Sequence, residues 1–89
     1  MDAIGIVVKF EPAGESFLLS VQTPQPLMRF LAHKGSITVN GVSLTVNQIA
    51  GDEFSVNLIP HTLAMTNLSE LVPGMHVNLE TDMLSLIHI

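Results

Sequence analysis

Polar side chains recur at every second position between residues 42 and 47. Ser43, Thr45 and Asn47 alternate there with aliphatic residues, and because successive side chains of a β-strand point to opposite faces, all three polar groups share one face. A hydroxyl group both donates and accepts hydrogen bonds, so this face could bind a flat heterocycle or a polyol chain. The alternative is a solvated strand face, since antiparallel sheets with one buried face show the same alternation.

Three charged residues are further candidates for chemistry. Lys34 is one of only three basic residues and precedes the segment that carries Ser43, so it could contact an anionic ligand, although a surface lysine is the commoner case. Glu80 and Asp82 are two positions apart and would share a strand face, which could bring together an acid and a base. Such pairs are more often uncoupled charges in solvent.

Motifs that the sequence lacks exclude several kinds of site. The chain has no cysteine, which removes thiolate nucleophiles and cysteine-bound metals. It has no GxGxxG motif and no P-loop, and Ser43 follows a hairpin signal and does not lie in a nucleophile elbow. The spacing of the histidines is not that of a metal site, and this applies to His33, His61, His76 and His88. We therefore expect neither a metal site nor serine hydrolase chemistry.

Charge and hydropathy limit the possible partners. Three basic and eight acidic residues give a formal net charge of -5, which leaves no cationic surface for a phosphate backbone, so nucleic acid is not an expected partner. The first residues have neither the basic region nor the apolar stretch of a signal peptide, and no apolar run approaches the length of a transmembrane helix. The expectation is a soluble cytoplasmic protein without a membrane partner.

Short apolar runs separated by turn residues predict an all-β protein. The 89 residues suffice for one small domain. Asn40-Gly41 predicts a tight hairpin, because both central residues of a type I′ turn adopt positive φ. A turn is predicted over residues 11–15, and short helical turns after Pro26 and between residues 61 and 71. Six strands are predicted, at 3–10, 16–23, 36–39, 42–47, 54–59 and 75–81.

The alternation along these strands predicts which side chains form the core. The outward faces are expected to carry mainly polar residues, among them Ser20, Ser55 and Asn57, together with Ile59. All four phenylalanines are expected in the core. The residues predicted to face inward are Phe17, Leu19, Val21, Val42, Leu44, Val46, Phe54, Val56 and Leu58. Because closure removes exposed strand edges, we predict a six-stranded antiparallel Greek-key β-barrel with one or two short helices.

An ordered series of motifs resembles a known protein family. The motifs are Lys34-Gly35-Ser36-Ile37-Thr38-Val39-Asn40-Gly41-Val42-Ser43-Leu44-Thr45-Val46, then Phe54-Ser55-Val56-Asn57-Leu58-Ile59-Pro60-His61-Thr62-Leu63, Thr66-Asn67-Leu68, Pro73-Gly74 and Val77-Asn78-Leu79-Glu80-Thr81-Asp82. Together they closely resemble the lumazine-binding repeat of riboflavin synthase, in particular its second, C-terminal repeat. The resemblance implies one lumazine-binding barrel over residues 1–83, whereas residues 84–89 do not match the tail of that family.

The resemblance also implies an activity, an assembly and a set of contact residues. Riboflavin synthases carry two such barrels per chain, assemble as trimers and place each site between barrels of neighbouring subunits. They convert two molecules of 6,7-dimethyl-8-ribityllumazine into riboflavin and a pyrimidinedione, without a metal or redox cofactor. No catalytic residue is assigned in this chain. The positions that match family contacts with the ligand are Lys34, Ser43, Thr45, Ile59, Thr62 and Asp82.

The same resemblance leaves alternatives to a complete enzyme. The companion barrel is absent from this sequence, and so is the Gly-His pair that precedes the first strand in the family. We therefore expect half of a ligand site, with catalysis requiring a second barrel or self-association. A second hypothesis is a non-catalytic lumazine- or flavin-carrying protein, such as the optical antenna proteins that share this repeat. A third is a structural half-barrel that pairs without binding a ligand.

Overall fold

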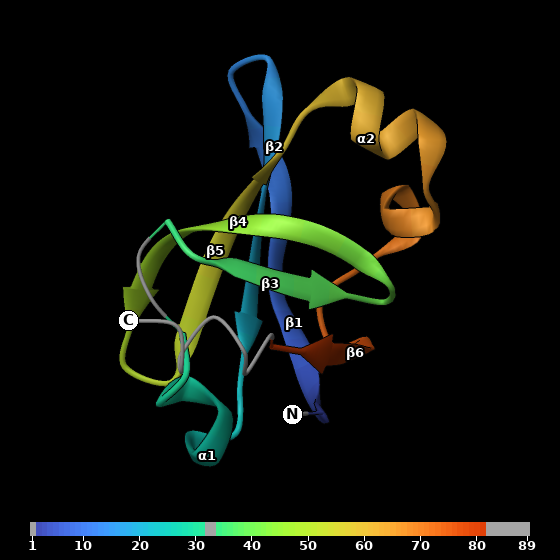
Figure 1. The fold of residues 1–89 in the computed structure, drawn as a ribbon. Coiled ribbons are helices and arrows are strands. Elements are labelled where there is room, and N and C mark those ends of the chain that lie inside the picture. The colour runs from blue at the N-terminus through green and yellow to red at the C-terminus, as the bar shows by residue number, and fades with distance from the viewer. Residues whose placement is uncertain (1, 32–33, 82–89) are drawn as a thin grey trace.

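The computed structural model describes residues 2–31 and 34–81, which form strands joined by short helical connections (Figure 1). The strands form a single sheet, and one short helix lies beyond one end of it. The elements are β1 (Asp2–Ala13), β2 (Ser16–Gln22), α1 (Gln25–Met28), β3 (Ser36–Val39), β4 (Val42–Ala50), β5 (Glu53–Leu58), α2 (Pro60–Met65), the 3-10 turn η1 (Asn67–Glu70) and β6 (His76–Glu80). The prediction of six strands and short helices is confirmed.

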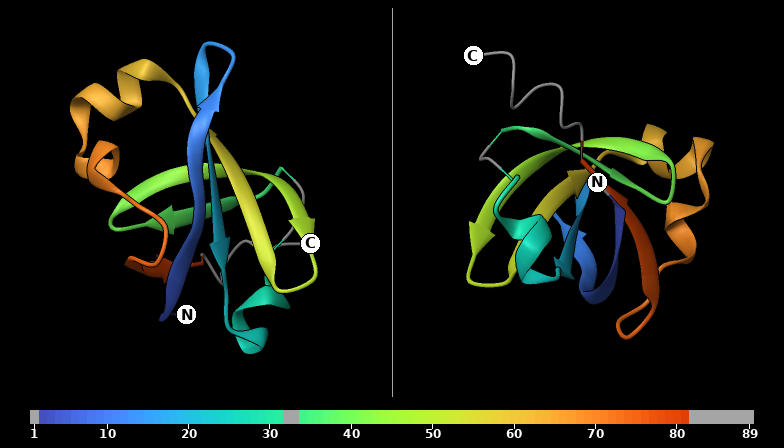
Figure 2. Two further views of the ribbon diagram at one scale, coloured as in Figure 1. Left: turned by 180° about the vertical axis from the view of Figure 1, so that it is seen from behind. Right: turned by 60° about the horizontal axis from the view of Figure 1, so that its bottom comes forward.

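The sheet closes on itself. The order of neighbouring strands is β1-β2-β5-β4-β3-β6, and β6 pairs back with β1. Every pairing is antiparallel, as predicted. The pairing of β3 with β6 is the shortest, with two residue pairs at Thr38↔Glu80 and Val39↔Leu79. Views from behind and from below show the strands curving around one interior (Figure 2).

The interior is filled by aliphatic side chains and one phenylalanine, whereas all four phenylalanines were expected there. Leu27 from α1 is 1% exposed and closes one end of the sheet. Phe54 is buried, whereas Phe10 and Phe17 are half-buried, pack against the core and hold their ring centroids 5.5 Å apart. Phe30 is half-buried after α1. The buried hydrophobic set is Val7, Leu19, Val21, Leu27, Ile37, Val39, Val46, Phe54, Val56, Leu58, Leu68, Leu71, Val77 and Leu79.

The first hairpin is longer than predicted. The turn expected over residues 11–15 is only Gly14-Glu15, and β1 continues through Pro12, which pairs with Phe17. A proline cannot donate to a strand ladder and is therefore confined to edges. The register of β6 against β1 ends at Ile6, so the later part of β1 has a neighbour on one side only. Pro12 fits there without removing a ladder bond.

Two strands each contain one extra residue relative to their partner. The register shifts between Val7 and Lys9 in β1 and between Val46 and Gln48 in β4. A β-bulge of this kind leaves the extra residue unpaired and bends the strand. In β4 the extra residue is Asn47, and the alternation of inward and outward side chains changes phase at that point.

The hairpin between β3 and β4 forms as the Asn-Gly pair predicts. Asn40 has φ 49° and Gly41 has φ 85°, the positive values that a type I′ turn requires. Asn40 also links this turn to β6, because its main-chain N–H donates to the Asn78 carbonyl over 2.8 Å. The Asn78 main-chain N–H in turn donates to Oδ1 of Asn40 over 2.7 Å. The turn residue thereby continues the short ladder between β3 and β6.

Candidate ligand-binding site

The outward face of β4 carries the hydroxyl groups that the sequence singles out. Ser43 and Thr45 are exposed, and they pair with Thr38 and Ser36 of β3 across the strand boundary. The intervening Leu44 is half-buried and packs against the core. The predicted shared face of Ser43 and Thr45 is therefore present.

A hollow of about 290 Å³ opens beside Thr45. Lys34 and Thr45, two of the residues named from the sequence, both line it. The complete lining is Lys34, Thr45, Val46, Asn47 and Asn57. The sequence placed Asn47 on the candidate polar face with Ser43 and Thr45, whereas Asn57 was expected on an outward strand face and not in the site. Residues that carry a cation, a hydroxyl group and two amides thus line one hollow beside Val46.

The position of Lys34 is set by its backbone. The N–H of Lys34 donates to the Val46 carbonyl over 2.8 Å, and the N–H of Val46 donates to the Gly35 carbonyl over 2.8 Å. Two residues therefore oppose one residue of β4, which is the arrangement of a β-bulge whose first position adopts the left-handed region. Lys34 occupies that position with φ 67°, although Gly35 is adjacent. A side chain in this region costs about 1 kcal/mol relative to glycine.

The other proposed contact residues lie outside this hollow. Ile59 was expected on the outward face of β5, but it follows the last residue of that strand, precedes α2 and is 55% exposed. Thr62 is half-buried within α2. Its main-chain carbonyl accepts a hydrogen bond of 2.7 Å from the hydroxyl of Thr66. The strand ends early because Pro60 cannot continue the ladder. Asp82 lies outside the described residues.

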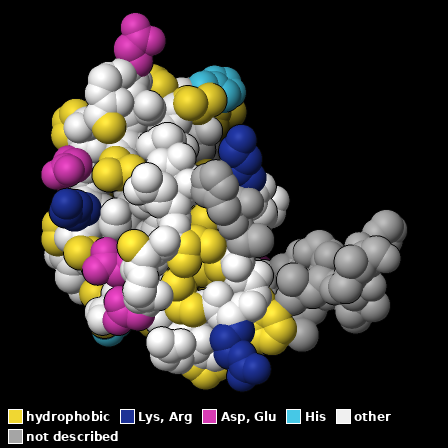
Figure 3. Space-filling view, turned by 90° about the vertical axis from the view of Figure 1, so that its left-hand side faces the viewer, with side chains coloured by type: hydrophobic (Ala, Val, Ile, Leu, Met, Phe, Trp, Pro, Cys, Tyr) yellow, Lys and Arg dark blue, Asp and Glu magenta, His cyan; other side chains and the backbone are white. Residues whose placement is uncertain are grey.

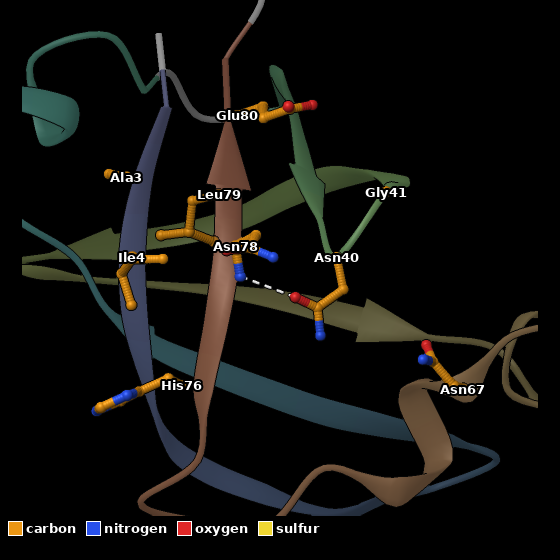
Figure 4. Close-up of a pocket in the computed structure, with 9 residues that line it drawn as sticks. All are labelled: Ala3, Ile4, Asn40, Gly41, Asn67, His76, Asn78, Leu79 and Glu80. Atoms are coloured by element: carbon orange, nitrogen blue, oxygen red, sulfur yellow. Dashed lines mark hydrogen bonds between the residues drawn. The ribbon is translucent and has the colours of Figure 1, made fainter.

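A larger hollow of about 780 Å³ lies on another side, around β6 and the Asn40-Gly41 turn (Figure 4). Its polar lining includes the amides of Asn67 and Asn78, the imidazole of His76 and the carboxylate of Glu80, without a Lys or Arg side chain. The full lining is Ala3, Ile4, Asn40, Gly41, Asn67, His76, Asn78, Leu79 and Glu80. We place the candidate site at the smaller hollow, because the sequence-predicted Lys34 and Thr45 both line it.

The basic side chains do not form a patch that could hold a polyanion. Figure 3 shows them well apart on one face, with acidic side chains between some of them. Within residues 2–31 and 34–81, no three His, Asp or Glu side chains are grouped as metal ligands. In the same ranges, no helix is long and apolar enough to cross a membrane.

Comparison with proteins of known sequence finds riboflavin synthases. The chain is 36% identical over 85 residues to the enzyme of Photobacterium phosphoreum, a match that covers 96% of this chain and 39% of that protein. It is 42% identical over 82 residues to the riboflavin synthase of Actinobacillus pleuropneumoniae, covering 92% of this chain and 38% of that one. The chain thus spans about two fifths of the length of these relatives.

Comparison with solved structures finds the same fold in LumP. The structure of LumP with 6,7-dimethyl-8-(1'-D-ribityl) lumazine superposes with a TM-score of 0.85 at 25% identity, covering 90% of this chain and 45% of that one. The structure of LumP with riboflavin gives a TM-score of 0.83 at 28% identity, covering 89% of this chain and 42% of that one. Residues 1–82 match the lumazine-binding domain family, and the chain belongs to this family.

Proposed function

We propose that this chain is a lumazine- and riboflavin-binding domain of a riboflavin synthase. The observation that carries the proposal is the meeting of Lys34 and Thr45 in one hollow, on a chain of the lumazine-binding family. The ligands are 6,7-dimethyl-8-ribityllumazine as substrate and riboflavin as product. The domain supplies half of a site, and no separate cofactor takes part.

The chemistry of the hollow suits a flat heterocycle with carbonyl groups. The ammonium group of Lys34 donates hydrogen bonds, and the hydroxyl of Thr45 both donates and accepts them. Ser43 lies two residues along the same exposed face and extends it. We assign Ile59, Thr62 and Asp82 to the same ligand, with Ile59 offering exposed apolar surface to a ring.

Catalysis requires a second domain in this proposal. The hollow is open on one side, so a partner must cover the bound ligand and present the second substrate molecule. Two rings held against each other react faster because the orientation that the reaction needs is already imposed. The partner is a second lumazine-binding domain of the same protein or of another copy, and the complete enzyme is a trimer in the cytoplasm.

We also assign the closed sheet to the Greek-key barrel class. Three strands joined by hairpins, β3, β4 and β5, are followed in the chain by β6, which lies beside β3. A Greek key has this order, in which a fourth strand returns beside the first of three consecutive hairpin strands. The long connection that it requires runs from β5 through α2 and η1 to β6.

Quenching of riboflavin fluorescence tests ligand binding and the site together. The parent chain should quench riboflavin on titration, and Ser43→Ala combined with Thr45→Ala should weaken binding several-fold. Ser69→Ala is the matched control, because this serine is exposed in η1 and does not line the hollow. Equal affinity of the double variant and the parent would place the ligand elsewhere.

A carrier without catalysis is the second candidate, because LumP binds the same ligands in the matched structures. A turnover assay with 6,7-dimethyl-8-ribityllumazine separates the two functions. The assay is run with this chain alone and mixed with a separately produced N-terminal domain of a riboflavin synthase. Riboflavin formation only in the mixture supports the enzyme, whereas tight binding without turnover in both samples supports the carrier.

A further inference from the structure

We propose that the side-chain amides of Asn47 and Asn57 recognise the imide edge of the ligand's pyrimidinedione ring. The inference rests on the proposed function and deepens it, since it assigns specificity for one edge of the heterocycle to two residues. Both line the hollow that contains Lys34 and Thr45.

Asn47 lies at the bulge in β4 and lines the hollow. Val46 pairs with Val56 and faces the core, whereas Gln48 pairs with Ser55. Asn47 is therefore an additional residue between two register pairs, and a bulge redirects the side chain of such a residue.

A second bulge lies on the other side of Val46, in the segment before β3. Lys34 and Gly35 together oppose Val46, and their bonds to it measure 2.8 Å. Val46 thus lies between an irregular pairing with the segment before β3 and an irregular pairing with β5. Irregular pairing on both sides of one buried residue opens the surface above it, where the lining groups converge.

Asn57 approaches the hollow from the neighbouring strand. It is exposed on the outward face of β5, where it pairs with Leu18 of β2. In the described part of the chain, neither Asn47 nor Asn57 has a side-chain hydrogen bond. Both amides keep their full capacity to donate and accept.

The amides match the imide edge chemically. A pyrimidinedione presents a carbonyl, an N–H group and a second carbonyl in a row. An asparagine side chain has a carbonyl acceptor beside two N–H donors, so it can pair with the N–H and one carbonyl at the same time, as asparagine does with a base edge. Two neutral amides leave the charge of Lys34 available for an anionic form of the ring.

The test compares riboflavin with 3-methylriboflavin, in which a methyl group replaces the imide hydrogen. Dissociation constants are measured by fluorescence titration for the parent, Asn47→Ala, Asn57→Ala and the control Asn78→Ala, whose exposed amide lines the other hollow. We expect each of the first two variants to bind riboflavin about fivefold to tenfold more weakly, the effect of one lost hydrogen bond. The control should bind like the parent.

The decisive comparison is between the affinities for riboflavin and for 3-methylriboflavin. The parent should lose affinity for 3-methylriboflavin, and the alanine variants should lose less, because they no longer read the imide edge. Asn47→Asp and Asn57→Asp preserve side-chain size and serve if an alanine variant fails to fold. They should weaken riboflavin binding because they replace a donor by an acceptor that repels the ring carbonyls.

The outcomes separate this inference from the proposed function. If the parent binds riboflavin and the Asn variants bind it equally well, the assignment of the two amides is wrong while the proposed function stands. The same holds if methylation weakens the parent and the variants by the same factor. A parent chain that does not bind riboflavin overturns the proposed function, and this inference with it.

Discussion

Lys34 donates its main-chain N–H to the carbonyl of Val46 over 2.8 Å while its own backbone adopts φ 67°. This conformation favours glycine, and Gly35 is the next residue. The bond fixes the Lys34 main chain at the hollow that Thr45 and two asparagines also line. Backbone strain at a site residue is typical of positions retained for function and not for stability.

Lys34→Gly should raise stability while lowering affinity. Glycine removes the strain of the left-handed conformation, so the free energy of unfolding should stay equal or rise by up to about 1 kcal/mol. Riboflavin affinity should fall several-fold because the ammonium group is lost. Urea denaturation and fluorescence titration measure the two effects.

The matched control is Lys9→Gly, which removes a cation from β1, away from the hollow. Glycine in a strand interior should cost about 0.5–1 kcal/mol and leave riboflavin binding unchanged. If Lys34→Gly instead destabilises the chain as Lys9→Gly does, the strain argument is incorrect.

Asn40→Gly should test the link between the β3–β4 turn and β6. Glycine accepts the positive φ of Asn40, so the turn keeps its backbone and loses only the acceptor for the Asn78 N–H. The expected loss in the free energy of unfolding is about 1 kcal/mol, measured by urea denaturation. Asn40→Asp keeps the acceptor and should lose less. Equal stability of parent and Asn40→Gly would show that this bond contributes nothing.

Local signals predicted the elements correctly where a few residues determine the structure. Asn40-Gly41 specifies its turn through two positive φ angles, and Pro60 ends β5 because it has no N–H. Residues 42 to 46 alternate as expected. These features depend on neighbours in sequence, so they can be inferred without knowing which strands pair.

Features that depend on partner strands were not predictable in this way. The extra residue Asn47 is visible only against the register of β5, and the extension of β1 through Pro12 depends on where β6 stops pairing. Ser20 and Ser55 lie opposite each other on the outward face and are nevertheless buried. The site has the same limit. Lys34 and Thr45 were candidates from charge and alternation and also matched family contacts, whereas Asn57 reaches the hollow through strand pairing.

Riboflavin should stabilise the folded chain if it binds as proposed. A ligand that binds only the folded state adds about 2.7 kcal/mol to the free energy of unfolding when its concentration is 100 times the dissociation constant. Thermal unfolding with increasing riboflavin should therefore show a rising midpoint. Thr45→Ala should show a smaller rise at equal riboflavin, and an identical rise would argue against a role for Thr45.

Gly5→Ala should weaken the closure of the sheet. A Cβ atom at Gly5 would lie 2.6 Å from Cδ1 of Leu79 and 2.6 Å from Cγ1 of Val21, and 3.1 Å from a main-chain carbonyl oxygen. Leu79 and Val21 are both fully buried, so neither can move without disturbing the core where β1 meets β6 and β2. Overpacking of this kind costs about 1–3 kcal/mol, which urea denaturation measures.

Two further variants determine whether overpacking is the cause. Ile4→Ala alters the neighbouring residue, which is 52% exposed, and should change stability by less than Gly5→Ala. Val21→Ala combined with Gly5→Ala frees space for the new methyl group, so the double variant should lose less than the sum of the two single variants. Strict additivity would mean that the methyl group and Val21 do not compete for the same space, and that Gly5 is required for another reason.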